Sequence, residues 1–197
     1  LSNAILASLR EDFAASVALA PEVERLIDRP SQQSEYLRIM AGGWQRQGAF
    51  KKAFDAYQEL AQLRADLQHS GGAAEMELEQ VDRNWNIRAD LWLQARIGEL
   101  LRTAGGAELA AMEQTIQQAF DQALASGEVA ALRKAERLFG MHARAEEVRL
   151  TLARRLVKTG EVLEAELLLS RLEESANAAV RAAAVAEQAE LMVLTRQ

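Results

Sequence analysis

Residues 40–60 decide the expected fold, and they read MAGGWQRQGAFKKAFDAYQEL. Small and large apolar residues flank Gly48 at offsets that recur around Gly160, in residues 152–172, which read LARRLVKTGEVLEAELLLSRL. The copies match in size class at eight positions, which in the first copy are Met40, Ala41, Trp44, Gly48, Phe50, Ala53, Tyr57 and Leu60. This pattern predicts two antiparallel helix pairs of a helical-repeat scaffold, each with its glycine at the tight turn.

Alanine is expected wherever two helix backbones come close together. Ala41 and Ala53 flank the first turn, and Ala153 and Ala165 flank the second. Small side chains at these positions allow close approach, and the large residues beside them fill the remaining gaps. Each pair buries one face internally and needs a neighbour for the other, so its stability is shared along a stack.

The composition favours helices throughout the chain. Alanine and leucine supply 66 of the 197 residues, whereas valine, isoleucine and threonine together supply 21. Strong helix formers therefore outnumber the β-branched residues that strands prefer. Both prolines lie within the first 30 residues, so later helices can run unbroken. We expect an all-α chain of about ten helices, arranged as a right-handed α-solenoid, with no sheet.

Glycines and prolines set the expected helix boundaries. The expected helices span 3–19, 21–29, 31–47, 50–67, 81–103, 107–125, 129–139, 143–158, 161–172 and 176–194. The clearest break is the pair Gly71-Gly72, which follows a polar pair. We therefore expect residues 1–70 to hold the N-terminal helices with the first pair. Residues 71–197 would hold degenerate repeats, one of them around Gly127, and the second clear pair at 143–172; one continuous solenoid is the alternative.

Charge and composition exclude several classes of partner. The formal charge is −6, and acidic and basic residues are interspersed, which disfavours nucleic acid held by its phosphates. No apolar stretch approaches the roughly 20 residues needed to cross a bilayer, and no signal peptide is visible. We expect no membrane insertion of this segment. Because the chain has no cysteine, disulfides and thiolate metal sites are excluded.

The first copy resembles the tetratricopeptide repeat, a two-helix unit with small and aromatic residues at defined positions. The resemblance rests on Met40, Ala41, Trp44, Gly48, Phe50, Ala53 and Tyr57. Neither copy has the proline that usually ends the unit. The chain between Gly71 and Gly127 also departs from the repeat length of about 34 residues. The resemblance therefore implies an irregular or interrupted array.

A second resemblance covers most of the chain from about Tyr36 onward. It rests on the strings Val81-Asp82-Arg83-Asn84-Trp85, Trp92-Leu93-Gln94-Ala95-Arg96 and Leu163-Glu164-Ala165-Glu166-Leu167-Leu168-Leu169. These look like the helical region of planctomycete proteins that also carry PQQ-type β-propeller repeats. The resemblance implies an extracytoplasmic, multidomain bacterial parent in which this segment is a spacer or docking module. Ser2-Asn3-Ala4 looks like the remainder of a cloning tag, which also leads us to expect a segment of a longer protein.

No combination of residues in the sequence indicates catalysis or a cofactor. His142 and Glu146 lie four residues apart but supply two metal ligands at most, and a surface pair is the better interpretation. His69 has no second ligand nearby and is expected to be solvent-exposed. The acidic residues Glu75, Glu77, Glu79 and Asp82 lack the pattern of a calcium loop, so we interpret them as a solvated loop or helix start. Phosphate-binding glycine loops and serine nucleophile motifs are absent. We predict a non-enzyme with no metal or cofactor.

Six residues are candidates for contact with a partner, which we expect to be a protein, a peptide or another domain of the same chain. Trp85 and Trp92 lie two helical turns apart and are typical binding anchors if exposed, although core packing is the more common role of tryptophan. The others lie on the first helix of the clearest repeat, where such scaffolds usually present a concave face: Tyr36, Arg38, Trp44 and Gln45.

Three functions remain open from the sequence. The leading hypothesis is a non-catalytic helical scaffold that mediates protein contacts, and it predicts an exposed groove or apolar end surface. The second is an all-helical enzyme or ligand-binding domain, which predicts an enclosed pocket with strongly shifted protonation. The third is a dimerisation module that uses the alanine-rich C-terminal helix.

Overall fold

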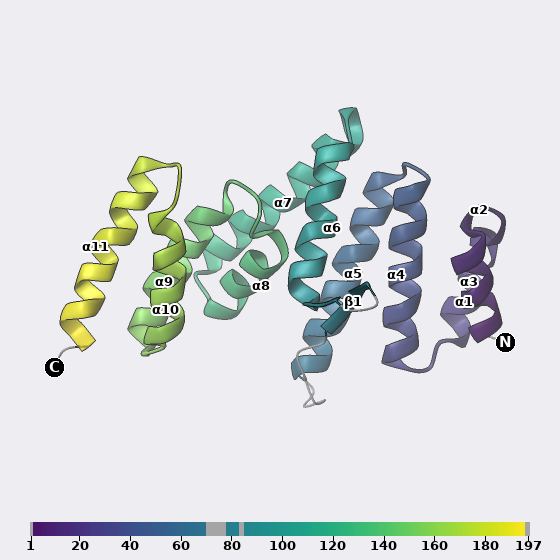
Figure 1. Ribbon diagram of the computed structural model, residues 1–197, viewed down its shortest axis with the longest axis horizontal. Helices are drawn as coiled ribbons and strands as arrows, with labels where there is room; N and C mark the ends of the chain where they lie inside the picture. Colours follow the sequence, from purple (N-terminus) through teal and green to yellow (C-terminus); the bar gives the residue numbers. More distant parts are fainter. Residues whose placement is uncertain (1, 70–77, 83–84, 196–197) are drawn as a thin grey trace. The chain divides into compact units, whose positions relative to one another are not determined.

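The computed structural model describes the backbone of residues 2–69, 78–82 and 85–195, and the side chains of residues 2–67 and 86–193. This part of the chain contains about ten helices packed largely in sequence order (Figure 1). The helices of the first half are α1 (Ser2–Glu11), α2 (Phe13–Ser16), α3 (Ala20–Leu26), α4 (Pro30–Arg46), α5 (Phe50–His69) and α6 (Ala89–Thr103). Those of the second half are α7 (Gly106–Ser126), α8 (Val129–Phe139), α9 (Ala145–Thr159), α10 (Val162–Glu173) and α11 (Ala178–Thr195).

The chain forms two compact units, Leu1–Glu113 and Gln114–Gln197, and the division falls within α7. Each unit has its own set of buried apolar side chains. The section boundary expected at Gly71-Gly72 lies outside the described residues.

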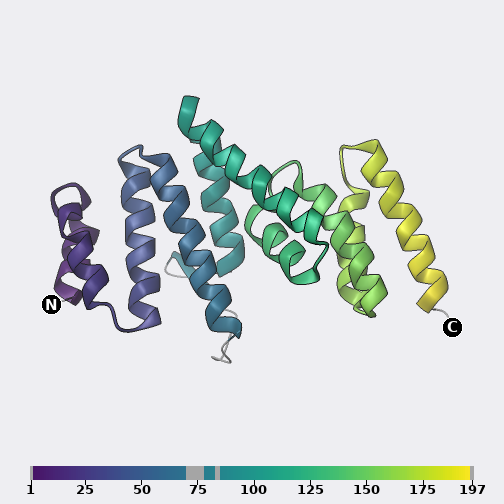
Figure 2. The same cartoon turned by 180° about the vertical axis from the view of Figure 1, so that it is seen from behind.

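Two helix pairs form where the repeated pattern predicts them. In both views, α4 and α5 lie side by side in the first unit (Figures 1 and 2). The pair α9 and α10 forms in the same way in the second unit. Because only three residues join α4 to α5 and two join α9 to α10, the helices of each pair run antiparallel.

The two turns have the same hydrogen bonds. Gly48 donates its N–H to the carbonyl of Gln45, at 3.1 Å, and Ala49 donates to Trp44 five residues back, at 3.0 Å. Gly160 donates to Val157 at 3.2 Å, and the next residue again donates five residues back, at 2.9 Å. This is the Schellman arrangement, which needs a left-handed residue at the position of the glycine. Gly48 and Gly160 have φ values of 74° and 83°, so glycine is required there.

The alanines of the repeated pattern are all buried. Ala41 and Ala53 in the first pair and Ala153 and Ala165 in the second have 0% exposure. The large residues Tyr57, Leu60, Leu169 and Leu172 extend the same cores, with at most 2% exposure. The prediction that these four alanines lie inside the helix pairs, away from solvent, is confirmed.

The third, degenerate copy has a different interior. Its Gly127 also has a left-handed backbone, with a φ of 62°. Phe120 and Leu132 occupy the positions that are alanine in the two clear copies, and both are fully buried. Phe120 packs edge-on against Phe139, with 6.0 Å between ring centroids. Large side chains therefore fill the space between the helices here, whereas alanine allows the backbones of the other pairs to lie closer together.

The expectation of no sheet is wrong. Strands β1 (Leu78–Asp82) and β2 (Trp85–Arg88) form an antiparallel hairpin, with Leu78 opposite Arg88. Valine, tryptophan and isoleucine in these nine residues favour strands, and the polar and apolar residues nearly alternate, which is the period of a strand. The hairpin is short and leaves the rest of the described chain helical.

Two expected helices also differ in extent. The helix expected at 81–103 begins at Ala89, because residues 85–88 are in β2. Val81 and Trp85, which the prediction places in this helix, belong to strands β1 and β2 instead. The helix expected at 3–19 is interrupted at Asp12, whose side chain accepts the backbone N–H of Ala15 at 3.1 Å and caps a new short helix.

Ion pairs connect the helices of the second unit. Arg133 on α8 donates to both carboxylate oxygens of Glu164 on α10 and also pairs with Glu161 at the start of α10. Hydrogen bonding from Arg133 holds the pKa of Glu161 below its usual range. Arg149 on α9 pairs with Glu136 on α8 at 3.0 Å, and both side chains are about 14% exposed or less. These pairs fix the relative positions of α8, α9 and α10.

Adjacent glycines in the middle of α4 give a matched stability test. A Cβ on Gly43 would overlap the ring of Phe13, whereas a Cβ on Gly42 would meet only the tip of Arg46, at 3.5 Å. Gly42→Ala should stabilise the first unit by up to about 1 kcal/mol, because alanine favours a helix interior. Gly43→Ala should be less stable than Gly42→Ala by about 1–3 kcal/mol, the usual cost of overpacking. Urea unfolding followed by tryptophan fluorescence measures both, since Trp44, Trp85 and Trp92 all lie in this unit. Equal stability of the two variants would contradict the packing.

The lowered pKa of Glu161 predicts how stability depends on pH. A carboxylate with a lowered folded-state pKa stabilises the fold above its unfolded pKa of about 4.3, and this stabilisation disappears as the pH falls through the folded value. Glu161→Gln should therefore lower the thermal midpoint at pH 7 more than at pH 3. Circular dichroism melts at both pH values test this, with exposed Glu174→Gln as the control. A decrease for Glu161→Gln that is independent of pH would contradict the role of ionised Glu161.

Candidate functional site

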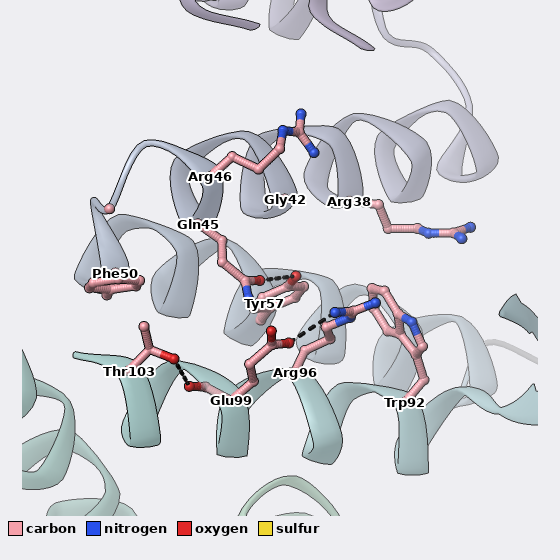
Figure 3. Close-up of a pocket in the computed structure, with 11 residues that line it drawn as sticks. Arg38, Gly42, Gln45, Arg46, Phe50, Tyr57, Trp92, Arg96, Glu99 and Thr103 are labelled. Carbon is pink, nitrogen blue, oxygen red and sulfur yellow. Dashed lines mark hydrogen bonds and ion pairs between the residues drawn. The ribbon is translucent and has the colours of Figure 1, made fainter. Parts of the chain in front are cut away.

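A groove of about 590 Å³ opens between α4, α5 and α6 in the first unit (Figure 3). Its volume falls within the range of roughly 300–1,000 Å³ that is typical of ligand sites. The lining residues are Arg38, Gly42, Gln45 and Arg46 from α4, Gly48 from the turn, Phe50 and Tyr57 from α5, and Trp92, Arg96, Glu99 and Thr103 from α6.

Helical spacing explains why these side chains gather on one side. On α4 the lining positions follow one another at intervals of four, three and one residues, and on α6 at intervals of four, three and four. Residues so spaced share one face of a helix. Other faces of the two helices are buried and hold them in place, through Leu37, Met40 and Ala41 on α4 and Leu93, Ile97 and Leu100 on α6.

Trp92 is the aromatic centre of the groove. The Arg38 guanidinium lies 5.6 Å from its ring centroid, and the Arg96 guanidinium lies 5.7 Å from it. Tyr57 meets the same indole edge-on, with 5.7 Å between ring centroids and an angle of 80° between the planes. The attraction between a cation and an aromatic face holds both arginines beside Trp92. Two positive charges from different helices therefore flank one half-buried ring.

Hydrogen bonds fix the polar side of the groove (Figure 3). Tyr57 donates its hydroxyl to the side-chain oxygen of Gln45, at 3.2 Å. Arg96 donates to the Glu99 carboxylate at 2.9 Å, and both of these side chains are exposed by 40% or more. Thr103 donates to the backbone carbonyl of Glu99, at 2.8 Å. Among the described side chains that line the groove, Glu99 is the acidic one.

The Tyr57 hydroxyl lies among charged side chains from α4 and α6. Burial raises the pKa of the Tyr57 hydroxyl, while the charges of Arg96, Arg46 and Arg38 oppose this increase. The negative charge of Glu99 acts in the same direction as burial. Three arginines and one glutamate therefore act on the same point, although the whole chain carries a net charge of −6.

Three of the six candidate residues lie at this groove: Arg38, Gln45 and Trp92. Tyr36 lies on the other side of α4. Its side chain is 5% exposed and donates a hydrogen bond to Glu24, at 2.7 Å. Burial, followed by this bond, raises the pKa of the Tyr36 hydroxyl.

The two remaining tryptophans have different positions. Trp44 packs edge-on against Phe13, with 5.1 Å between ring centroids, and Lys52 lies 4.4 Å from the centre of its ring. It therefore joins α4 to the N-terminal helices, away from the groove. The backbone of Trp85 belongs to β2, and its side chain lies outside the described residues.

Arg96 and Glu99 complete the groove opposite α4, and neither was among the candidate residues. Their spacing from Trp92, four and seven residues, places them on the same face of a helix. This signal was present in the sequence. Until the position of α6 beside α5 is known, however, this face of α6 cannot be distinguished from a helix face that simply contacts solvent.

His142 and Glu146, which lie four residues apart, form separate interactions. The His142 ring nitrogen Nδ1 accepts the backbone N–H of Arg144 at 3.1 Å, and the Glu146 carboxylate accepts the hydroxyl of Ser175 at 2.7 Å. Among the residues that the structure describes, no group of three potential ligands could hold a metal ion. The side chain of His69 and the residues Glu75 and Glu77 lie outside the described part.

In the second unit, α11 exposes apolar side chains beside and beyond its core residues Ala184 and Leu191. Val185, Met192 and Val193 are 53%, 51% and 66% exposed. This face is the one that the dimerisation alternative would use. No helix in the described ranges is long and apolar enough to cross a membrane.

Comparison of the chain with protein-family models, with curated proteins and with solved structures finds no match. What is established, for the described part of the chain, is a fold of about ten helices with one short hairpin, and its resemblances to known families stay predictions.

Proposed function

We propose that this chain is a non-catalytic helical scaffold whose groove between α4, α5 and α6 binds a segment of polypeptide. In this proposal α4–α5 and α9–α10 are tetratricopeptide-like units of a right-handed α-solenoid. The polypeptide belongs to a partner protein or to another domain of a larger parent chain. The observation that carries the proposal is an open groove in which a tryptophan is surrounded by side chains able to form hydrogen bonds.

The lining of the groove suits a peptide. Trp92 offers an aromatic anchor, which is a residue type enriched at binding hot spots. Gln45, Arg38 and Arg46 supply amide and guanidinium groups along one helix, which can pair with the backbone and side chains of an extended ligand.

The alternative of an enzyme has weaker support from the described residues. The groups with shifted pKa values there are two buried tyrosines and three members of surface ion pairs. Tyr57, the one at the groove, has its pKa raised further from neutrality. A general acid or base works best with a pKa near the working pH, so this site lacks the tuning that proton transfer uses.

Filling the groove tests the proposal. Gly42 lines the groove and faces only the tip of Arg46, so Gly42→Leu should place its side chain into the groove without disturbing the core. Peptides selected from a random display library on the wild-type chain should bind Gly42→Leu at least tenfold more weakly. Fluorescence anisotropy of labelled peptides measures the loss.

The control is Gln33→Leu, which changes an exposed position on the same helix and should leave binding unaltered. Failure to select any peptide, or equal binding to wild type and Gly42→Leu, would refute the proposed function.

A further inference from the structure

We infer that Gln45 recognises the main chain of the bound segment, by donating a hydrogen bond from its side-chain amide to a backbone carbonyl oxygen, and that the Tyr57 hydroxyl positions this amide. The inference rests on the proposed function and specifies how its ligand is recognised. The ligand is then an extended polypeptide that is bound through its peptide groups.

The first argument is the orientation of the Gln45 side chain. Tyr57 donates its hydroxyl to Gln45 Oε1, with 3.2 Å between the two oxygens, and within the described part of the chain it is the hydrogen-bond partner of this side chain. A glutamine amide has an acceptor oxygen and a nitrogen with two donor hydrogens. A bond to the oxygen therefore leaves the nitrogen to donate to a ligand. Figure 3 shows the side chain extending from α4 toward α6, within the lining of the groove.

The second argument is that packing holds Tyr57 in place. Its side chain is 2% exposed, and its ring meets the Trp92 indole edge-on, with 5.7 Å between ring centroids. Burial also raises the pKa of the Tyr57 hydroxyl, so this group stays protonated and donates at neutral pH. Because a fixed donor holds the Gln45 amide in one orientation, less conformational entropy is lost when the amide binds a ligand.

The third argument is the place of Gln45 relative to the aromatic centre of the groove. Gln45 comes from α4 and Trp92 from α6, and Tyr57 contacts both of them. A segment with a side chain packed on Trp92 therefore has its main chain beside the Gln45 amide. Carbonyl groups recur about every 3.3 Å along an extended chain, so the amide finds an acceptor in peptides of many sequences. Hydrogen bonds to the main chain then supply affinity, and side-chain contacts supply specificity.

This arrangement predicts unequal and coupled effects of two substitutions. Gln45→Met keeps the length of the side chain and removes its amide, so it should weaken peptide binding by about two- to tenfold, the worth of one neutral hydrogen bond. Tyr57→Phe keeps the ring beside Trp92 and removes the hydroxyl. Its effect should be smaller, because the amide is still present but is no longer held in place. The double variant should bind as Gln45→Met does, since Tyr57 acts through Gln45.

The main chain of the peptide supplies the readout that a structural role would not change. The probe is the tightest peptide from the library selection, labelled with fluorescein and measured by anisotropy on the full chain. It is compared with versions in which one peptide bond at a time is replaced by a trans-alkene, which keeps the shape of the bond but lacks its carbonyl. At least one replacement should weaken binding to the wild-type chain. That loss should be absent in Gln45→Met and smaller in Tyr57→Phe.

Tyr36→Phe and Gln33→Met are the matched controls. Tyr36→Phe removes a buried hydroxyl that bonds to Glu24 on the other side of α4, and Gln33→Met changes an exposed glutamine of the same helix. Both controls should bind the peptide, and each of its alkene versions, as the wild-type chain does.

Several outcomes would overturn the inference. Unchanged affinity of Gln45→Met, or alkene losses that are the same in Gln45→Met and wild type, would refute recognition of the main chain by Gln45. Equal effects of Tyr57→Phe and Tyr36→Phe would refute the positioning role of Tyr57. The proposed function fails separately, when the selected peptides bind Gly42→Leu as well as they bind wild type. A library that yields no peptide would overturn both.

Discussion

Close packing of two helices against each other, permitted by alanine on both, is the constraint on which the rest of the structure depends. Ala41 and Ala53 are completely buried in the first pair, as are Ala153 and Ala165 in the second. Each pair is closed by a left-handed glycine, and in both turns the glycine and the residue after it donate the same two hydrogen bonds. Dispersion and burial gain most when backbones approach closely, and a much larger side chain at these positions would separate the helices.

The groove follows from this pairing. Packing of α4 against α5 buries one face of α4 and leaves the face with Arg38 and Gln45 exposed. Packing of α6 beside α5 then places Trp92 and Arg96 opposite that face. Arginines on the groove-facing sides of α4 and α6 supply its positively charged side chains. Trp92, whose indole packs against the buried Tyr57, supplies its aromatic centre. The groove therefore depends on residues that the repeat does not itself require.

The sequence predicted the two helix pairs well, but it predicted the hairpin and the groove residues poorly. The periodic apolar residues and the turn glycine fully specify a pair such as α4–α5, so its existence could be predicted. The hairpin β1–β2 was missed because alternation over a few residues was outweighed by the helical composition of the chain. Half of the candidate site residues lie at the groove because helical spacing places them on one face. Trp44 lies away from the groove because its ring packs against Phe13, and this contact could not be read from helical spacing. Arg96 and Glu99 could not be assigned before the position of α6 was known.

Engineered cross-linking tests the central claim most directly, because the chain has no cysteine of its own. A disulfide requires Cα atoms within about 7 Å. Ala41→Cys combined with Ala53→Cys should therefore form an intramolecular disulfide on mild oxidation, with the helical circular dichroism unchanged. Ala41→Cys combined with Ala61→Cys, which moves the second cysteine about 12 Å along α5, should not. Failure of the first pair to cross-link, or equal yields from both pairs, would contradict close approach of the two helices at their alanines.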